Sequence, residues 1–255
     1  MLPVLLCLKE KFKKKKMASS LEQKFFEYCR INEEAEVRKV LPKVSVNWRN
    51  PQLFSYTGLH IACICGHTGL TSLLLKHPSI SVNQLDLNGS SPFLLACMAG
   101  RTEIVKVLLQ DARVDVNLDD KWRVSPLWWA ANNGHCEVVK WIIASGRAHE
   151  CLEDAREAFG SRDRNLLTAI EIARGNGRQQ LVELLLRFKR DPASLQKELA
   201  IQLGYLGMLS PFFFFFCLFA CLLACLFVCL FVALMPCCSR RHAGGEPICP
   251  GRVPQ

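Results

Sequence analysis

Short apolar runs at helical spacing recur along most of the chain, and polar residues separate them. In Ile104–Leu109, five of the six residues are apolar, and the polar residues Thr102 and Glu103 precede them. Such runs predict short helices with one apolar face, which must pack against neighbouring elements. Residues 212–235 follow a different pattern, because they contain no charged and no strongly polar side chain. A helix over this segment would be about 36 Å long, and the core of a bilayer is about 30 Å thick.

The short helices belong to a repeat, and its constant period, about 34 residues, is typical of repeat architectures. Three related segments stand at this spacing, namely Thr57–Ala62, Ser91–Ala96 and Ser125–Ala130. The same spacing separates the glycines that follow them, Gly66, Gly100 and Gly134. A hydroxyl residue before a helix, a proline in its first turn and a glycine after its last turn are common boundaries of a short helix. The repeat therefore predicts successive pairs of helices in one register.

This unit resembles the ankyrin repeat, whose signature is Thr-Pro-Leu-His-x-Ala in a unit of about 33 residues. Its Val-Asn and Trp-Trp-Ala motifs resemble those of the large ankyrin-repeat families of single-celled eukaryotes. The resemblance implies an all-α solenoid of helix-turn-helix units with β-turn fingers, in which each unit packs only on its neighbours. We predict a repeat domain at 17–190, with a half-unit at 24–44 and full units at about 52–85, 86–119, 120–153 and 163–190. An insertion of about nine residues precedes the last unit.

The ends of the chain differ from the repeats in charge. The formal net charge is +9, of which residues 1–16 carry +5 and residues 17–209 only +2. We predict a disordered basic leader at 1–16, and Met17 is an alternative start. Residues 191–211 are predicted to form a tether, with a short helix as the alternative, and residues 236–255 a disordered tail. Since the repeats are nearly neutral, they offer no basic groove, and nucleic-acid binding is not favoured.

The apolar segment at 212–235 has two interpretations. Its length and composition predict a transmembrane helix. From Cys217 to Val232, however, tetrapeptides such as Cys-Leu-Phe-Val repeat, and a translated tetranucleotide DNA repeat would produce the same pattern. Whether residues 212–255 are genuine coding sequence therefore stays open, as does the membrane topology.

The sequence contains few candidates for chemistry. His60, Cys63, Cys65 and His67 lie within eight residues, but on a helix positions 60, 63 and 67 share a face that excludes position 65. A structural zinc site needs four converging ligands, so we expect no metal and no cofactor here. Neighbouring His and Cys residues elsewhere lack the third group that would orient a catalytic base. We therefore expect no catalytic residue and no enzyme.

The resemblance implies that a partner protein binds the finger tips and the exposed side of the first helix of each unit. The candidate residues are Leu53, Phe54, Tyr56 and Ile64 in the first unit; Leu87, Asn88, Ser90 and Met98 in the second; Lys121, Trp122, Val124, Asn132 and Asn133 in the third; and Arg164 and Asn165 in the fourth. Exposed aromatic residues and methionine are typical of interface cores. We expect Trp128, Trp129 and Trp141 to lie in the core instead.

These features favour a non-enzymatic scaffold or adaptor that binds another protein through its repeats. The repeat domain is expected to be cytoplasmic, with or without a membrane anchor at the C-terminal end, because the chain shows no secretory leader and no Cys-x-x-Cys pair. The alternative is a membrane-embedded component whose C-terminal helix pairs or senses lipid, with the solenoid as its cytosolic handle. No residue indicates the identity of the partner or the oligomeric state.

Overall fold

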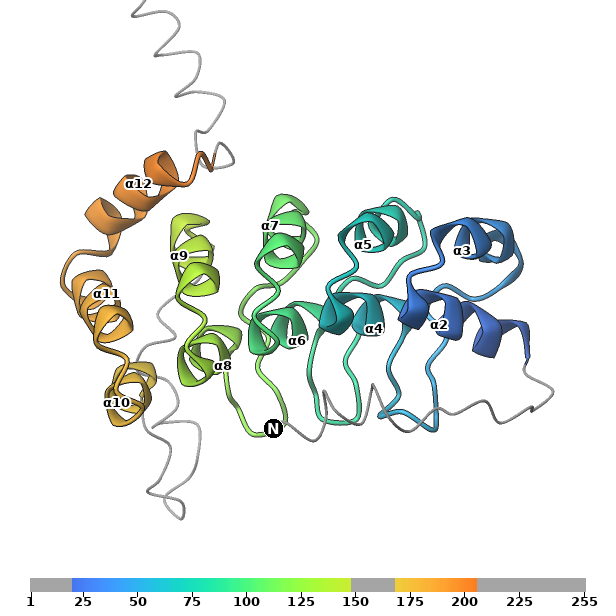
Figure 1. Cartoon of the computed structure of the whole chain (residues 1–255), viewed down its shortest axis with the longest axis horizontal. Helices are drawn as coiled ribbons and strands as arrows, with labels where there is room; N and C mark the ends of the chain where they lie inside the picture. Colours follow the sequence, from blue (N-terminus) through green and yellow to red (C-terminus); the bar gives the residue numbers. More distant parts are fainter. Residues whose placement is uncertain (1–19, 148–167, 206–255) are drawn as a thin grey trace, which may run out of the picture. The chain divides into compact units, whose positions relative to one another are not determined.

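The computed structural model describes residues 20–147 and 168–205 (Figure 1). By its internal contacts the chain divides into two units, residues 1–208 and 209–255, and every described residue belongs to the first. The helices are α2 (Leu21–Ile31), α3 (Glu34–Val40), α4 (Gly58–Cys65), α5 (Thr68–Leu75), α6 (Pro92–Met98), α7 (Thr102–Gln110), α8 (Pro126–Asn133), α9 (Cys136–Ala144), α10 (Ala169–Gly175), α11 (Gln179–Arg190) and α12 (Pro192–Gln202), with a short 3-10 turn at Leu41–Lys43.

Several expectations fall outside the described residues. They concern the basic leader at 1–16, the insertion before the last unit, the transmembrane helix at 212–235 and the tail at 236–255. Within residues 20–147 and 168–205, no helix is long and apolar enough to cross a bilayer. The same residues form no β-strand beyond one antiparallel bridge between Asn50 and Tyr56.

The helices form two rows (Figure 1). The first helices of successive units, α2, α4, α6, α8 and α10, each contact the next. The second helices α5, α7 and α9 form the other row and also contact one another in sequence. This arrangement confirms the expected helical stack of ankyrin type.

The expected caps set the helix starts. The Ser91 hydroxyl accepts a hydrogen bond from the Leu94 amide at 3.1 Å, and the Ser125 hydroxyl accepts one from the Trp128 amide at 3.2 Å. Proline follows each of these serines, in the first turn, where a missing N–H costs nothing. In the first unit, Thr57 and His60 cap each other's backbone amides instead.

The core consists of columns of equivalent side chains that run from unit to unit. One column is formed by Phe25, Leu59, Phe93 and Leu127, and a second by Leu74, Leu108 and Ile142. Each of these side chains is at most 2% exposed. These side chains belong to one continuous core that spans all the described units, so the core exists only where units are stacked.

A polar contact also repeats between units. The ring nitrogen Nε2 of His67 donates to the carbonyl of Arg30 at 3.0 Å, and Arg101 Nε donates to the carbonyl of Ile64 at 2.9 Å. His135 Nε2 reaches the carbonyl of Met98 at 3.2 Å. Donors and acceptors each recur at the period of the repeat, so each of these bonds joins the start of a second helix to the end of the first helix of the preceding unit. The bonds satisfy carbonyls that a short helix leaves without an internal partner.

For residues 191–211 the sequence left a tether or a short helix open, and the structure shows a helix at Pro192–Gln202 followed by an ordered chain to residue 205. Helix α12 begins with Pro192, and the side chain of Asp191 caps it by accepting from the Ser194 amide. Leu195 and Leu199 are buried, and the helix contacts α9 and α11. Residues 206–211 lie outside the described residues. Leu195 and Leu199 lie one turn apart on the same face of α12, and this apolar face explains why the segment packs against the repeats.

Tyr205 completes this contact. Its hydroxyl donates to the carbonyl of Leu109 at 3.3 Å, and its ring meets that of Trp141 edge-on at 5.8 Å. The ammonium of Lys106 lies 4.9 Å from the centre of the same Trp141 ring. Helix α12 and Tyr205 therefore cover α9, the second helix of the third unit.

The packing of α12 can be tested with two residues of the same helix. Leu199→Ala removes a side chain that is 3% exposed, and we expect it to lower the free energy of unfolding by about 2–4 kcal/mol. Ile201→Ala removes one that is 82% exposed, and we expect a change of less than about 0.5 kcal/mol. Urea unfolding of the full chain, followed by circular dichroism, measures both. Equal effects would show that the segment is a tether.

Candidate functional site

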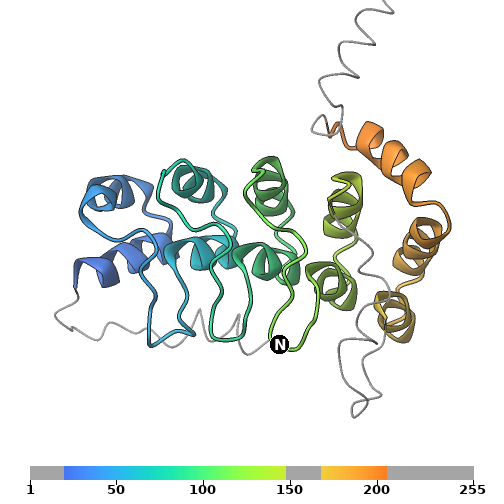
Figure 2. The ribbon, with the colours of Figure 1, turned by 180° about the vertical axis from the view of Figure 1, so that it is seen from behind.

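Three extended loops, which we call fingers, project from the helix pairs. Finger 1 comprises residues 47–56, finger 2 residues 83–90 and finger 3 residues 117–124 (Figure 2). The amide of Leu87 donates to the carbonyl of Phe54 at 2.9 Å, and the amide of Lys121 donates to that of Asn88 at 2.9 Å. Donors and acceptors are again one repeat apart. The fingers are therefore tied to one another, backbone to backbone, in the register of the repeat.

Asparagine side chains tie the bases of the fingers to the following units. Asn83 Nδ2 donates to the carbonyl of Arg113 at 2.8 Å, and Asn83 Oδ1 accepts from the Asp115 amide at 2.9 Å. Asn47 makes the corresponding pair of bonds to the backbone at residues 79 and 81. The fingers are thus held at both ends, and their tips have a fixed spacing.

An aspartate shapes the turn of fingers 2 and 3. Asp86 Oδ1 accepts from the amides of Asn88 and Ser90 at 2.6 and 2.7 Å. Asp120 Oδ1 accepts from the amides of Trp122 and Val124 at 2.9 and 3.0 Å. Such bonds from an aspartate to the amides that follow it stabilise a tight turn.

The second carboxylate oxygens of these two aspartates differ. Asp120 Oδ2 accepts from Trp129 Nε1 at 2.9 Å, whereas Leu95 stands one repeat earlier and offers no donor. Asp86 Oδ2 is buried, and no described residue hydrogen-bonds to it. Burial raises the pKa of Asp86, because the carboxylate loses its contact with water and the hydrogen bonds from the two amides make up for this only in part.

The structure leaves part of the expected binding set exposed. Phe54 and Trp122 are each 45% exposed and Leu87 is 62% exposed, and Lys121 is exposed beside them. The remaining half-buried candidates are Leu53, Asn88, Met98, Asn132 and Asn133. Arg164 and Asn165 lie outside the described residues. We call Phe54, Leu87 and Trp122 the tip row.

Four expected contact residues are buried, which corrects the sequence-based surface. Tyr56, Ser90 and Val124 each end a finger directly before a helix cap, and the chain turns inward there. Tyr56 stacks on the His60 ring at 5.7 Å and is 2% exposed. Ile64 belongs to the apolar core. None of these side chains is available to a partner.

The three tryptophans that we expected in the core are half-buried. Trp128 and Trp141 pack against the core, and the rings of Trp128 and Trp129 meet edge-on at 5.1 Å. The indole of Trp129 is held by its bond to Asp120. These side chains therefore lie at the margin of the core rather than inside it.

Six exposed residues of the fingers lie outside the expected set, namely Arg49, Pro51, Gln52, Leu85, Asp119 and Arg123. Leu85 is 37% exposed, and Arg49 and Arg123 are exposed cations. Arg49 was overlooked because finger 1 is two residues longer than fingers 2 and 3. When the units are aligned by their helices, the start of finger 1 is therefore out of register with the starts of the other two fingers. Arg123 directly follows Trp122, and that proximity was the available signal.

The histidines and cysteines near residue 60 are used for packing. The His60 ring bonds to Thr57 Oγ1 at 2.8 Å and to the carbonyl of Ser90 at 3.2 Å, and His67 bonds to the carbonyl of Arg30. Cys63 is fully buried. In the part of the chain that the structure describes, no three His, Cys, Asp or Glu side chains converge as metal ligands would. Burial lowers the pKa of His60 to about 4, so this ring is neutral at pH 7.

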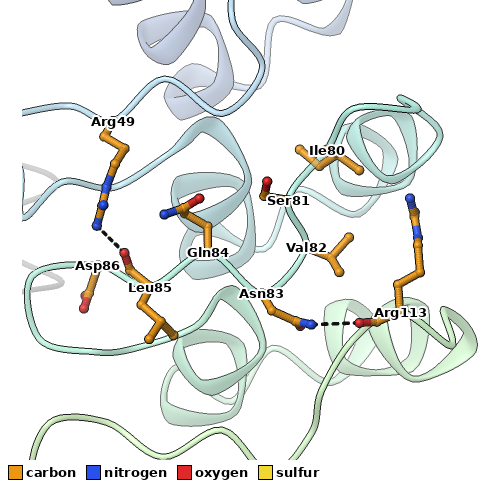
Figure 3. A pocket seen from close by; sticks show the side chains of 9 residues that line it. All are labelled: Arg49, Ile80, Ser81, Val82, Asn83, Gln84, Leu85, Asp86 and Arg113. Atoms are coloured by element: carbon orange, nitrogen blue, oxygen red, sulfur yellow. Dashed lines mark hydrogen bonds between the residues drawn. The ribbon is translucent and has the colours of Figure 1, made fainter.

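A groove of about 660 Å³ lies where finger 2 leaves α5 (Figure 3). Its walls are the extended segment 80–86 with Arg49 and Arg113 at the two sides. Arg49 donates to the carbonyl of Leu85, and Arg113 donates to that of Leu75, so both guanidinium groups already bind backbone. A smaller groove recurs one unit later beside Arg147. The groove is therefore a gap between units that recurs with the repeat.

Comparison with known families matches two segments of the chain. Residues 26–120 match a family model described as ankyrin repeats in three copies, and residues 123–155 match one described as an ankyrin repeat. Together the two matches cover half of the chain. No curated protein matches it.

The tie between fingers 2 and 3 can be tested at Gly89. Gly89 and Gly177 both have left-handed backbones, with φ of +75° and +70°. A Cβ on Gly89 would lie 2.7 Å from the Lys121 backbone nitrogen, whereas one on Gly177 would meet nothing within 4 Å. We expect Gly177→Ala to cost about 1 kcal/mol through strain alone, and Gly89→Ala about 1–3 kcal/mol more.

Urea unfolding of both glycine variants measures this difference. Hydrogen exchange at the Lys121 amide adds a local readout, and we expect it to be faster in Gly89→Ala than in the wild type. Equal losses of stability in the two variants would contradict the close approach of the fingers.

The buried His60 makes stability depend on pH. Its pKa in the folded chain is about 4, below the ordinary 6.5, so its stabilising effect is complete above pH 6.5 and is lost as the pH falls toward 4. The full loss is about 3 kcal/mol. In His60→Leu we expect lower stability at pH 7.5, by about 1 kcal/mol for the lost hydrogen bonds, but a shallower decline between pH 6.5 and 4. Unfolding in urea at several pH values checks this, and an unchanged slope would refute it.

Proposed function

Since the chain belongs to the ankyrin-repeat proteins, we propose that it is a non-enzymatic interaction module that binds one partner protein on its finger tips. The observation that carries the proposal is the tip row. Phe54, Leu87 and Trp122 stand on three consecutive fingers, and all are large apolar side chains that stay exposed. Large exposed aromatic and aliphatic residues gathered in one region are typical of protein-binding surfaces.

The backbone ties between fingers support a binding role. A loop that is ordered only on binding loses conformational freedom, and this loss weakens the complex. Here the amides of Leu87 and Lys121 already fix each finger to its neighbour. The tip row is therefore preorganised, and its apolar area can contribute to affinity without that cost.

The cysteine environments favour binding over catalysis. Burial raises the pKa of the Cys29 and Cys63 thiols, and that of Cys97 is raised as well. Protonated, enclosed thiols are poor nucleophiles. All five cysteines of the described residues are free, which is usual in reducing compartments and supports our proposal that the repeats work in the cytosol. No observation on the described residues favours the alternative membrane role.

Exchange of the tip row for serine tests the proposal. We expect the full chain with Phe54→Ser, Leu87→Ser and Trp122→Ser to capture its partner from lysate with at least about 100-fold lower affinity, because each residue would contribute about 1–2 kcal/mol or more. Quantitative pull-down measures the capture, and circular dichroism checks that the helices remain.

Three exposed apolar residues away from the fingers provide a matched control. Ile31, Leu186 and Ile201 are 47%, 41% and 82% exposed. The triple variant Ile31→Ser, Leu186→Ser and Ile201→Ser should capture the partner as the wild type does. An equal loss in this variant would show that the partner does not depend on the tip row.

A further inference from the structure

The backbone amides at the tips of fingers 2 and 3 are already bound within the chain. Every amide at residues 87–90 donates to an acceptor of the chain, and so does every amide at residues 121–124. The acceptors are oxygens of Asp86 and Asp120 and a carbonyl of the preceding finger. An extended peptide is held largely by backbone bonds to the protein that it binds. These two tips therefore offer such a peptide no free backbone donor.

An α-helix does not have this requirement, because its backbone groups are bonded to one another. It can bind through side chains alone, with an apolar face against exposed apolar residues. The fingers offer such residues, since Phe54 and Trp122 are 45% exposed and Leu87 is 62% exposed. Leu85 adds to this surface, because it is exposed two residues before Leu87, while the intervening Asp86 is buried.

The backbone bonds of the fingers also set the distances along the tip row. The Leu87 amide bonds to the carbonyl of Phe54, so these two residues stand on adjacent segments. Three further segments lead from Leu87 to Trp122, through the bonds within finger 2, between fingers 2 and 3, and within finger 3. Adjacent bonded segments lie about 4.8 Å apart. Along the row, Leu87 is therefore about 5 Å and Trp122 about 19 Å from Phe54.

These distances predict the register of a bound helix. Residues i, i+4 and i+14 share one face of a helix and lie at about 0, 6 and 21 Å along its axis. Side chains at these positions match Phe54, Leu87 and Trp122 to within about 2 Å. The helix axis would then run across the fingers, from one to the next.

The charges on the fingers favour an acidic residue within this helix. The exposed charged side chains of the three fingers are three cations and one carboxylate, namely Arg49, Lys121, Arg123 and Asp119. The Lys121 ammonium lies 4.4 Å from the ring centre of Trp122 and donates to Asn88 Oδ1 at 2.8 Å, so its position is fixed. Asp119 offsets part of this positive charge, and the balance of the exposed charges is still positive, which complements an acidic partner.

We propose that the tip row binds an amphipathic α-helix of the partner protein, laid across the three fingers. The helix places apolar side chains from positions i, i+4 and i+14 against Phe54, Leu87 and Trp122, in either chain direction. An acidic side chain between the last two positions lies near Lys121. The inference rests on the proposed function, since it specifies what the tip row binds.

A displayed library of random peptides, selected on the immobilised full chain, tests this inference. The peptides have about 20 residues, enough to cross all three fingers as a helix. We expect the bound peptides to carry apolar residues at i, i+4 and i+14. The strongest one is then synthesised, and its Kd is measured by fluorescence anisotropy. Lys121→Gln should weaken its binding most at low salt, and Ile31→Ala should leave it unchanged.

Proline in the peptide tests whether it binds as a helix. We expect proline, at a middle position where alanine is tolerated, to weaken binding at least tenfold, because it breaks a helix. The mixture of peptide and protein should also show more helical circular dichroism than the sum of the separate spectra. A peptide that tolerates proline would overturn the inference, and so would a selection that returns no peptide.

Paired substitutions test the register. Leu87→Ala should weaken the intact peptide at least tenfold, but it should have little further effect on a peptide that already carries alanine at i+4. Trp122→Ala should behave in the same way toward position i+14. Effects that are simply additive at both positions would overturn the proposed register.

The same peptides separate this inference from the proposed function. Binding that tolerates proline but is lost in Phe54→Ala, Leu87→Ala and Trp122→Ala would overturn the helix and would still support the tip row. Binding that is kept in all three variants would overturn both.

Discussion

Every feature of this protein depends on the contact between one helix pair and the next. A single unit is too small to bury its own apolar face, so the columns that contain Leu59 and Phe93 form only in the stack. The contact also has a polar part, because side chains at the starts of α5, α7 and α9 bind a carbonyl near the end of the first helix of the preceding unit. Arg101 and His135 both act in this way, on Ile64 and Met98. These bonds therefore fix the register of each unit relative to the next.

A segment that follows the repeats also packs against them. Helix α12 contacts both α9 and α11, its residue Leu199 is buried there, and Tyr205 reaches across to the carbonyl of Leu109. The second helices of the last two described units are therefore covered by a part of the chain that does not share the period of the repeat.

Sequence reasoning recovered the features that are local and periodic. The caps at Ser91 and Ser125 follow from short-range chemistry, and the family and the helical fold follow from the repeat. Burial within a finger could not be derived in this way, because it depends on where the chain turns inward before the next helix, as it does at Tyr56, Ser90 and Val124. Tyr56 turns inward onto His60, although its neighbour Phe54 stays outside. A short helix was one of the two expectations for residues 191–211, but its packing could not be derived, because it depends on Trp141 and α9, which are far from it in sequence.

The fingers share one backbone arrangement but carry different side chains at their tips. Phe54, Asn88 and Trp122 occupy the same place in successive fingers, and the first two use their carbonyls in the same bond. Asn88 is polar and bonds to Lys121, whereas Phe54 and Trp122 are aromatic and exposed. At the following position finger 3 approaches Gly89 closely, whereas the equivalent Ser55 and Arg123 carry side chains. The backbone bonds that order the fingers therefore leave the tip side chains free to differ, which is what a surface proposed to select a partner requires.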